Sequence, residues 1–376
     1  MTLNIPADAP QRLYESIDEL ETPVVVVDLR IMDRNVDDYV SFAEANDVSL
    51  RSHTKTHKIP DIAHMQHRRT GDGIVCQTLG EVEVMAQNGI DDIYLSYSVV
   101  EPSKLDRLVW LSRKLDRFAT TVDCRGNIDP LQNAASARDA TVEAILEIDL
   151  GYERTGVSPG HAVALARSVA KAPNLEFGGV MAFEAHVKAD TPSRADLKRG
   201  CQRAMDELAT VVDEIEDVGI PVDDVKVGGT ATSKFSGAHP VVTEINPGMY
   251  PFNDTGELAV RSYELDKRDC AVTVLATVIS KPADDRVIVK AGSKSISVDT
   301  DRMPIPKHRD DLKYYRASEE HGWVETPTGT EVEVGDRIEF IVPHVCTTIN
   351  LHDTLVGIRN GTIEEVWEIQ GRGKVR

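Results

Sequence analysis

The feature that most constrains the fold of this chain is a regular alternation of short apolar runs with helix-sized spacers. The first run, Val24–Val27, is continuous, as expected for a strand buried on both faces. The spacer after it has apolar side chains at helical spacing, namely Val36, Tyr39, Val40 and Ala43. The strand candidates of this pattern are Val24–Val27, Val48–Leu50, Gly73–Val75, Ile93–Leu95, Ala119–Val122, Ala144–Ile148, Gly179–Ala182 and Val225–Val227.

These candidates match the eight parallel strands that close a TIM-like barrel. The pattern therefore predicts an α/β fold with an (α/β)8 barrel over residues 22–260, and an open doubly wound sheet is the alternative. Beyond residue 260 helical spacing becomes sparse, and we expect a C-terminal all-β domain over residues 261–376, to which residues 1–21 could attach. Its strand candidates are Ala271–Ile279, Arg286–Lys290, Glu331–Val334 and Arg337–Val342.

The charge balance restricts the partners of the chain. It has 42 Lys and Arg against 62 Asp and Glu, a net charge of −20, so phosphate backbones are repelled and we expect no nucleic-acid partner. No apolar run is long enough for a membrane helix. The first twenty residues lack the apolar stretch of an export signal, so we expect a cytoplasmic protein without membrane contact, whose five cysteines are reduced.

A basic segment, Arg51–Lys58, directly follows the second strand candidate. In a barrel the carboxyl ends of the strands form the active-site mouth, where burial and nearby cations lower the pKa of a lysine and leave a nucleophilic amine. Lys55 is therefore a candidate nucleophile. The simpler interpretation, a basic surface turn, stays open on the residues alone.

A glycine-rich turn with the sequence VGGTAT, Val227–Thr232, follows the last strand candidate of the barrel. Glycines allow the backbone to approach a phosphate, and amides and threonine hydroxyls donate hydrogen bonds to it. The phosphate site of such barrels lies after the seventh and eighth strands. Gly228, Gly229 and Thr230 are thus candidates for phosphate binding, although a Gly-Gly turn is often only a turn.

A histidine and a cysteine, His344 and Cys346, stand two residues apart after the last strand candidate. On an extended strand their side chains would share one face, and imidazole with thiolate suits Zn²⁺. A chance His-x-Cys pair is the alternative.

Four segments together resemble the D-threonine aldolase and eukaryotic-type D-serine dehydratase family, whose members are alanine-racemase-like, fold-type III pyridoxal-phosphate (PLP) enzymes. They are TPVVVVDL at Thr22–Leu29, RSHTKTHK at Arg51–Lys58, CQTLGEVEVMAQNGIDDI at Cys76–Ile93 and EIDLGYERTGV at Glu147–Val157. The resemblance implies that Lys55 is the lysine bonded to PLP. It also implies that Arg154 lies against the phenolate oxygen of the cofactor.

The resemblance extends to the rest of the site. In this family two segments together form a phosphate cup, the site that binds the cofactor phosphate. EINPGMYPFND at Glu244–Asp254 is similar to the second of them, which implies that Gly248, Met249 and Tyr250 contact the phosphate. It implies a divalent metal at His344 and Cys346, with Zn²⁺ first and Mn²⁺ or Mg²⁺ as alternatives. One departure concerns substrate choice, because Phe183 and Ala185 stand where relatives have a tyrosine and a glycine.

The implied function is that of a PLP- and metal-dependent lyase for D-configured 3-hydroxy amino acids, in a homodimer. Dehydration to a 2-oxo acid and ammonia is the preferred hypothesis, because dehydratase-like members have His-x-Cys and many aldolase members have His-x-Asp. The alternative is retro-aldol cleavage to glycine and an aldehyde, with His57 as a candidate base. An amino-acid racemase and a non-catalytic PLP-binding protein are less favoured hypotheses.

Overall fold

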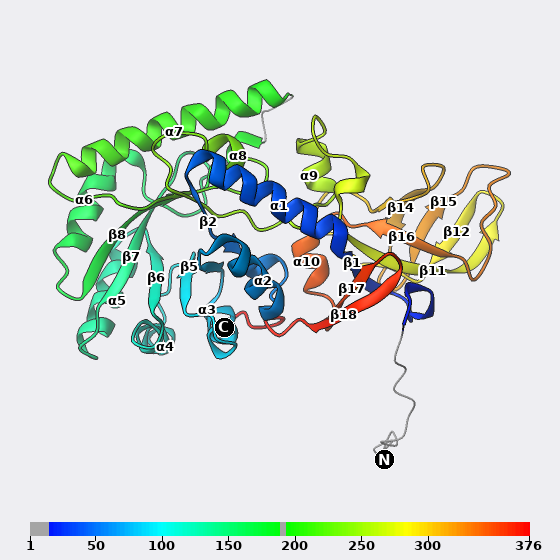
Figure 1. The fold of residues 1–376 in the computed structure, drawn as a ribbon, viewed down its shortest axis with the longest axis horizontal. Coiled ribbons are helices and arrows are strands. Elements are labelled where there is room, and N and C mark those ends of the chain that lie inside the picture. Colours follow the sequence, from blue (N-terminus) through cyan, green and yellow to red (C-terminus); the bar gives the residue numbers. More distant parts are fainter. Residues whose placement is uncertain (1–14, 189–192) are drawn as a thin grey trace, which may run out of the picture.

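The computed structural model describes residues 15–188 and 193–376 and contains two sheets (Figure 1). One is parallel and curls into a nearly closed barrel, in the order β2-β10-β9-β8-β7-β6-β5-β4-β3. Only Arg51 separates β2 from β3, so these two short strands are halves of one barrel strand. The barrel strands are β2 (Ser49–Leu50), β3 (Ser52–His53), β4 (Ile74–Cys76), β5 (Asp92–Leu95), β6 (Arg117–Val122), β7 (Val142–Ile148), β8 (Leu175–Ala182), β9 (Val225–Val227) and β10 (Glu244–Ile245).

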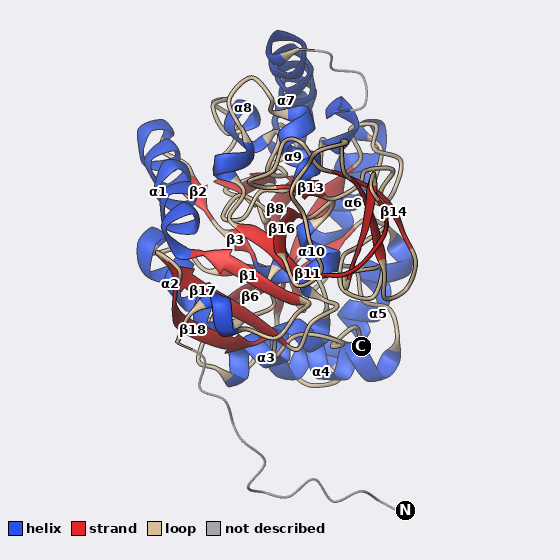
Figure 2. Cartoon of the chain, turned by 90° about the vertical axis from the view of Figure 1, so that its right-hand side faces the viewer, coloured by secondary structure: helices blue, strands red, loops and turns tan. Residues whose placement is uncertain are grey.

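Helices surround the barrel strands, as the view in Figure 2 shows. The helix predicted after the first apolar run is α1 (Leu29–Asn46), which Asp28 caps by accepting hydrogen bonds from two amides. Its buried side chains include Val36, Tyr39 and Ala43, at the predicted spacing. The other helices are α2 (Pro60–Thr70), α3 (Leu79–Gln87), α4 (Pro102–Ser112), α5 (Arg125–Ser136), α6 (Pro159–Ala170), α7 (Arg194–Glu216), α8 (Ser233–Ser236), α9 (Thr255–Val260) and α10 (Val345–Ile349), with 3-10 turns η1 (Ile17–Glu19), η2 (Thr54–Thr56), η3 (Ala185–Lys188) and η4 (Lys267–Asp269).

The second sheet has the order β14-β15-β12-β11-β1-β17-β18, with β16 between β11 and β13. Its strands are β1 (Val24–Asp28), β11 (Val272–Ala283), β12 (Arg286–Val289), β13 (Ile305–Pro306), β14 (Lys313–Ala317), β15 (Gly322–Glu325), β16 (Arg337–Ile341), β17 (Thr354–Arg359) and β18 (Thr362–Glu368). The parallel barrel and the separate, mostly β C-terminal part confirm the predicted fold class. The strand predicted at Glu331–Val334 is wrong, because these residues lead into a turn.

The first strand candidate was placed in the wrong sheet. β1 pairs antiparallel with β11 and parallel with β17, so it is a central strand of the second sheet. Val25, Val26 and Val27 are fully buried there, which explains the continuous apolar run. The barrel strand that the prediction lacks is β10, which has two residues only. The boundaries 22–260 and 261–376 stay a prediction, and residues 1–14 of the attached segment lie outside the described residues.

A chain of buried and half-buried ion pairs joins several barrel strands. Arg51 contacts Asp92 at 2.6 Å and Glu244 at 2.8 Å. Lys226 contacts Glu244 at 3.1 Å and Asp224 at 2.8 Å. These residues lie in or next to β2, β5, β9 and β10, so the network joins strands that are distant in the sequence.

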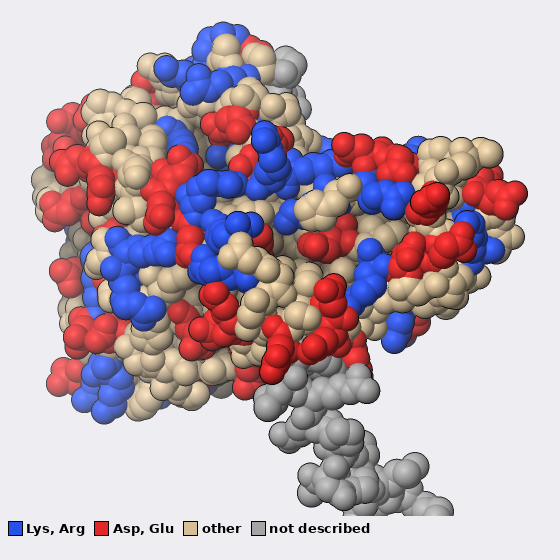
Figure 3. Space-filling view, turned by 45° about the vertical axis from the view of Figure 1, so that its right-hand side comes forward, with Lys and Arg blue, Asp and Glu red and all other residues tan. Residues whose placement is uncertain are grey.

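The surface carries charges of both signs. On the face in Figure 3, Lys and Arg side chains lie among patches of Asp and Glu. No helix in the described parts of the chain has the length and apolar composition needed to cross a membrane.

Candidate active site

Most of the predicted site residues, but not His57 and Tyr250, meet in a cavity of about 270 Å³ at the carboxyl ends of the barrel strands. The predicted residues that line it are Lys55, Arg154, Gly228, Gly229, Thr230, Gly248, Met249, His344 and Cys346. Most of them follow the ends of β3, β9 and β10, and Arg154 lies in the loop after β7. Cys346 lies in α10, and His344 directly precedes this helix. In barrels this end carries the active site.

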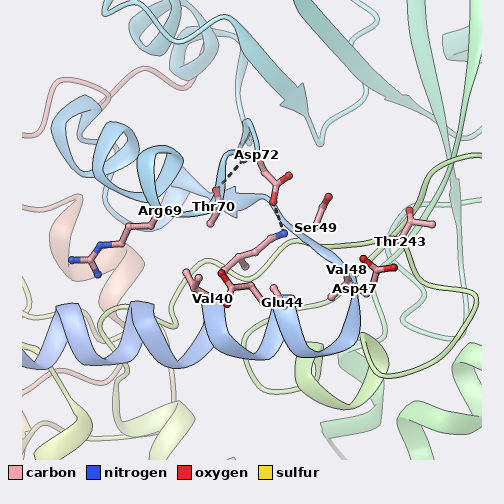
Figure 4. Close-up of a pocket in the computed structure, with 11 residues that line it drawn as sticks. Val40, Glu44, Asp47, Val48, Ser49, Arg69, Thr70, Asp72 and Thr243 are labelled. Atoms are coloured by element: carbon pink, nitrogen blue, oxygen red, sulfur yellow. Dashed lines mark hydrogen bonds between the residues drawn. The ribbon is translucent and has the colours of Figure 1, made fainter.

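Another cavity, of about 290 Å³, lies at the opposite end, where β2 and β10 begin. Figure 4 shows Glu44, Asp47 and Asp72 around it. Asp72 is already engaged, because its Oδ2 accepts a hydrogen bond from the amide of Leu50 at 2.8 Å. None of the residues predicted for the site lines this cavity, and we place no chemistry there.

Lys55 lies in η2, directly after β3. Its Nζ donates a hydrogen bond to Oε1 of Gln77 at 3.3 Å. Burial lowers the pKa of the Lys55 amine; Cys346 acts in the opposite direction, and Arg154 lowers the pKa further. The position after a barrel strand therefore gives Lys55 the properties of a nucleophilic amine.

Gln77 is a cavity residue that the sequence analysis missed. It follows β4 directly, as Lys55 follows β3, and this strand-end position was the available signal. Its Oε1 also lies 3.1 Å from Nε2 of His53, and its Nε2 donates a hydrogen bond to the carbonyl of Ser96 at 2.8 Å. Lys188 also lines the cavity, from η3. The quoted segment Cys76–Ile93 contains Gln77 but suggested no site residue, and no motif marked Lys188.

His57 and Tyr250 do not line the cavity, contrary to the implied roles. His57 is fully buried; its Nδ1 accepts a hydrogen bond from the amide of Ile59 at 3.0 Å, and its Nε2 lies 3.2 Å from Oε1 of Gln66. Burial lowers the pKa of His57 to about 4. The hydroxyl of Tyr250 lies 2.7 Å from Oγ of Ser52 and faces the same buried cluster. Both side chains therefore belong to a buried hydrogen-bonded cluster that includes Gln66.

The glycine-rich turn forms one side of the cavity. Gly228 has a φ of +104°, which favours glycine. A Cβ on Gly229 would lie 3.0 Å from Cε2 of Phe183, and the hydroxyl of Thr230 accepts a hydrogen bond from the amide of Met249 at 2.9 Å. That bond holds the turn after β9 against the segment after β10. The two predicted halves of the phosphate cup are thus adjacent.

His344 and Cys346 face the cavity by a different geometry from the predicted strand. His344 is the N-cap residue of α10 and Cys346 is its second residue, so the backbone turns into a helix where the prediction had an extended chain. Nδ1 of His344 lies 2.7 Å from Oδ2 of Asp299, and Sγ of Cys346 donates to Oγ1 of Thr56 at 3.3 Å. Cys346 and Asp299, opposed by burial, raise the pKa of His344 to about 9. No group of three ligating side chains occurs among residues 15–188 and 193–376.

The departure at Phe183 changes the aromatic wall of the cavity. The Phe183 ring makes a T-shaped contact with Tyr152 at 5.2 Å between centroids, and the guanidinium of Arg154 lies 5.1 Å from the Phe183 centroid. Glu184 points away and accepts a hydrogen bond from Ser236 at 2.7 Å. The phenol in this part of the cavity is therefore that of Tyr152, which a loop supplies.

Comparisons with known proteins cover both the barrel and the C-terminal part of the chain. The family model of the alanine racemase N-terminal domain matches residues 27–255, and that of the putative serine dehydratase domain matches residues 271–358. The 3-hydroxy-D-aspartate aldolase of Paracoccus denitrificans is 34% identical over 95% of this chain and 93% of its own. The D-threo-3-hydroxyaspartate dehydratase of Delftia sp. is 27% identical over 89% and 93%.

A solved structure gives the same result for the fold. The D-threonine aldolase of Filomicrobium marinum superposes with a TM-score of 0.91 at 32% identity, over 98% of this chain and all of that one. These matches include the barrel, with the turn that contains Lys55, and the second sheet. The chain therefore belongs to the alanine-racemase-like, fold-type III PLP-enzyme family that includes D-threonine aldolases and D-serine dehydratases.

Proposed function

We propose that this protein is a PLP- and metal-dependent lyase that cleaves D-configured 3-hydroxy amino acids to glycine and an aldehyde. The observation that carries this proposal is one cavity lined by a partly buried lysine, a glycine-rich turn and a His-Cys pair. These are the parts needed for an amine anchor, a phosphate site and a cation site.

The residues present fit PLP. Lys55 is a partly buried amine with a lowered pKa, and a Cβ at Gly228 or Gly229 would crowd Ser233 or Phe183, so the turn needs both glycines. Arg154 also lines the cavity, with its guanidinium over two aromatic rings. PLP, when bound, supplies an electron sink next to the substrate Cα.

The residues present also fit a divalent metal. Nδ1 of His344 is engaged by Asp299, which leaves Nε2 for a metal in the usual carboxylate–histidine arrangement. Imidazole and thiolate together favour Zn²⁺ over Mn²⁺ and Mg²⁺. Two protein ligands leave positions for water and substrate oxygens. The chemistry that such a metal supplies is Lewis-acid polarisation of a substrate oxygen.

The protein's own groups would bind and orient the substrate. The Lys55 amine, once free, can hold or move a proton at Cα, and Oε1 of Gln77 orients that amine. His57 is outside the cavity and is no longer our candidate base for the β-hydroxyl. The phenol of Tyr152 and the ring of Phe183 restrict the space for the substrate side chain.

Retro-aldol cleavage is placed first because the aldolase relative is the more similar, at 34% identity against 27% for the dehydratase. Dehydration is the second candidate, favoured by Cys346, because the family's dehydratase-like members have cysteine at this position. Both reactions use the same substrate class and the same cavity, so the products distinguish them.

The test is a product assay with D-threonine, D-serine and 3-hydroxy-D-aspartate. We expect glycine and acetaldehyde from D-threonine, and we expect a chelator to abolish turnover, which added Zn²⁺ or Mn²⁺ then restores. Mainly 2-oxobutanoate and ammonia would move the assignment to a dehydratase. Formation of L-allo-threonine without cleavage, or turnover that chelators leave unchanged, would contradict the proposal.

The glycine at position 248 provides a further prediction about the cofactor site. A Cβ there would lie 2.9 Å from Oγ1 of Thr56 and 3.0 Å from the carbonyl oxygen of His53. Gly248→Ala should therefore push apart the two segments that border the cavity, weakening PLP affinity by roughly tenfold, since overpacking costs about 1–3 kcal/mol. Fluorescence titration of the apoprotein with PLP measures this.

The matched control is Gly160→Ala in α6, where the added Cβ meets open space. This variant should bind PLP like the wild type. Equal PLP affinity for both variants would show that Gly248 does not limit the cofactor site.

The implied homodimer and the cytoplasmic location remain predictions. Light scattering of the purified protein should give twice the chain mass of 41.4 kDa. A monomer that is fully active would contradict the dimer.

A further inference from the structure

Lys58 joins three parts of the molecule next to the candidate active site. It follows η2, the turn that carries Lys55, and its amide donates a hydrogen bond to the carbonyl of Thr54 at 2.8 Å. Its side chain is only 12% exposed, although it is a lysine. Buried lysines are normally paired, and Lys58 is paired on two sides.

The first contact of Lys58 is with the end of α10, the helix next to the candidate metal ligands. Its Nζ donates a hydrogen bond to Oδ1 of Asn350 at 2.9 Å. Asn350 is the C-cap residue of α10, and its amide donates to the carbonyl of Cys346 at 3.2 Å. A single side chain of the barrel therefore holds the end of the helix that contains Cys346 and that His344 caps.

The second contact of Lys58 leads back to the Lys55 amine. Nζ of Lys58 lies 3.3 Å from Oε1 of Glu81, whose side chain is 2% exposed. Oε2 of Glu81 accepts a hydrogen bond from the backbone amide of Gln77 at 2.9 Å. The side-chain Oε1 of Gln77 accepts a hydrogen bond from Nζ of Lys55 at 3.3 Å. The Glu81 carboxylate thus links the two lysines through Gln77.

The backbone of Lys58 is fixed as well. Its φ is +58°, in the left-handed region that non-glycine residues rarely adopt, so surrounding contacts must maintain it. The carbonyl of Lys58 accepts a hydrogen bond from the amide of Gly371 at 3.0 Å. A Cβ at Gly371 would lie 2.8 Å from Cβ of Lys58, so the C-terminal segment packs closely on this residue.

We propose that Lys58 is a positioning residue that holds α10, with its metal ligands His344 and Cys346, in register with the Lys55 turn. The inference rests on the proposed function, because it concerns the metal site of that same cavity. α10 belongs to the segment after the barrel, and the metal and the lysine act on one substrate only if their spacing is fixed. Lys58 provides that link because its ammonium lies between the side-chain amide of Asn350, the C-cap residue of α10, and the carboxylate of Glu81 in α3.

The test measures zinc affinity of the purified PLP-loaded protein by competition with a chromophoric chelator. Lys58→Met should weaken zinc binding by about 10- to 100-fold, as loss of outer partners of a metal site does. The visible absorbance of the bound cofactor should stay at its wild-type position, because Lys55 is untouched. Lys58→Arg, which keeps a cation between Asn350 and Glu81, should retain most of the zinc affinity.

Asn350→Leu is the second variant, and it keeps the test valid if Lys58→Met does not fold. It removes the acceptor on α10 and leaves the Lys58–Glu81 pair, so zinc binding should weaken in the same direction. Lys281→Met, at a distant pair with Glu333, is the control for loss of a lysine. It should bind zinc like the wild type.

Wild-type zinc affinity in folded Lys58→Met and Asn350→Leu would overturn the inference. His344→Ala separates this result from failure of the proposed function. If the wild type binds zinc and His344→Ala does not, the metal site stands and only the role of Lys58 is refuted. If His344→Ala binds zinc like the wild type, the metal site itself is wrong.

Discussion

Replacing Lys55 by alanine is expected to lower turnover of D-threonine by at least about 1,000-fold, the range in which a positioned acid–base group contributes. The amine would serve both as the anchor of the cofactor and as the group that moves a proton at Cα, so its loss removes two functions together. The visible absorbance of the bound cofactor should also disappear. Steady-state kinetics and absorbance spectra measure the two effects on the same sample.

Lys55→Arg is the matched control for this experiment. Arginine keeps the positive charge beside Gln77 but cannot form the covalent bond, so it should be as inactive as alanine. Lys294→Ala, at an exposed pair with Glu320, should be fully active. Turnover within tenfold of the wild type in Lys55→Ala would exclude this lysine as the anchor.

Replacing Lys226 by methionine is expected to lower the free energy of unfolding by about 3 kcal/mol, since removing one partner of a buried ion pair leaves an uncompensated charge. Lys226 has a side chain that is 2% exposed and lies between Asp224 and Glu244. Arg51 stays beside Glu244, which places the effect at the low end of the range for buried pairs. Denaturant titration at neutral pH measures it.

The pH dependence of unfolding provides a second readout for Lys226. Burial raises the pKa of Glu244, but Arg51 and Lys226 outweigh burial and hold it below its ordinary value. A lowered carboxyl pKa stabilises the fold above the unfolded-state pKa of about 4.3, and this contribution is lost as the pH falls through the folded-state pKa. In Lys226→Met the folded-state pKa of Glu244 should rise, so this contribution should be smaller and its loss should be complete at a higher pH. The control Lys294→Met should unfold like the wild type, and an unchanged acid profile in Lys226→Met would contradict the network.

The sequence predicted the barrel well because the barrel depends on periodicity, and the candidate site is predicted from the same strand ends. Lys55 and Gly228–Thr230 follow strand candidates, and a barrel brings all such strand ends to one mouth. The structure places these residues around one cavity. The family resemblance then supplied the chemistry, which spacing alone left open.

The misplaced strand has a physical explanation. A continuous apolar run such as Val24–Val27 indicates burial on both faces but does not tell which sheet the strand joins. Its antiparallel partner, β11, lies almost 250 residues further along the chain, at Val272–Ala283. β10 escaped notice because it has two residues, one of which, Glu244, belongs to the ion network inside the barrel.

Two features of the candidate site were beyond sequence reasoning. The spacing of His344 and Cys346 suits a shared face on a strand, yet the chain turns into α10, where an N-cap residue and the second helical residue meet. The linkage of Lys58 with Asn350 and Glu81 depends on side chains from three elements. No local pattern marks such a contact.

The most direct test of the central claim is to reduce the PLP-loaded protein with borohydride and identify the labelled peptide by mass spectrometry. Borohydride fixes the bond between the cofactor and its lysine, so the label marks the anchor. We expect a cofactor adduct on Lys55 and on no other lysine. A label on Lys58 or Lys188, or a protein that retains PLP without any lysine adduct, would contradict it.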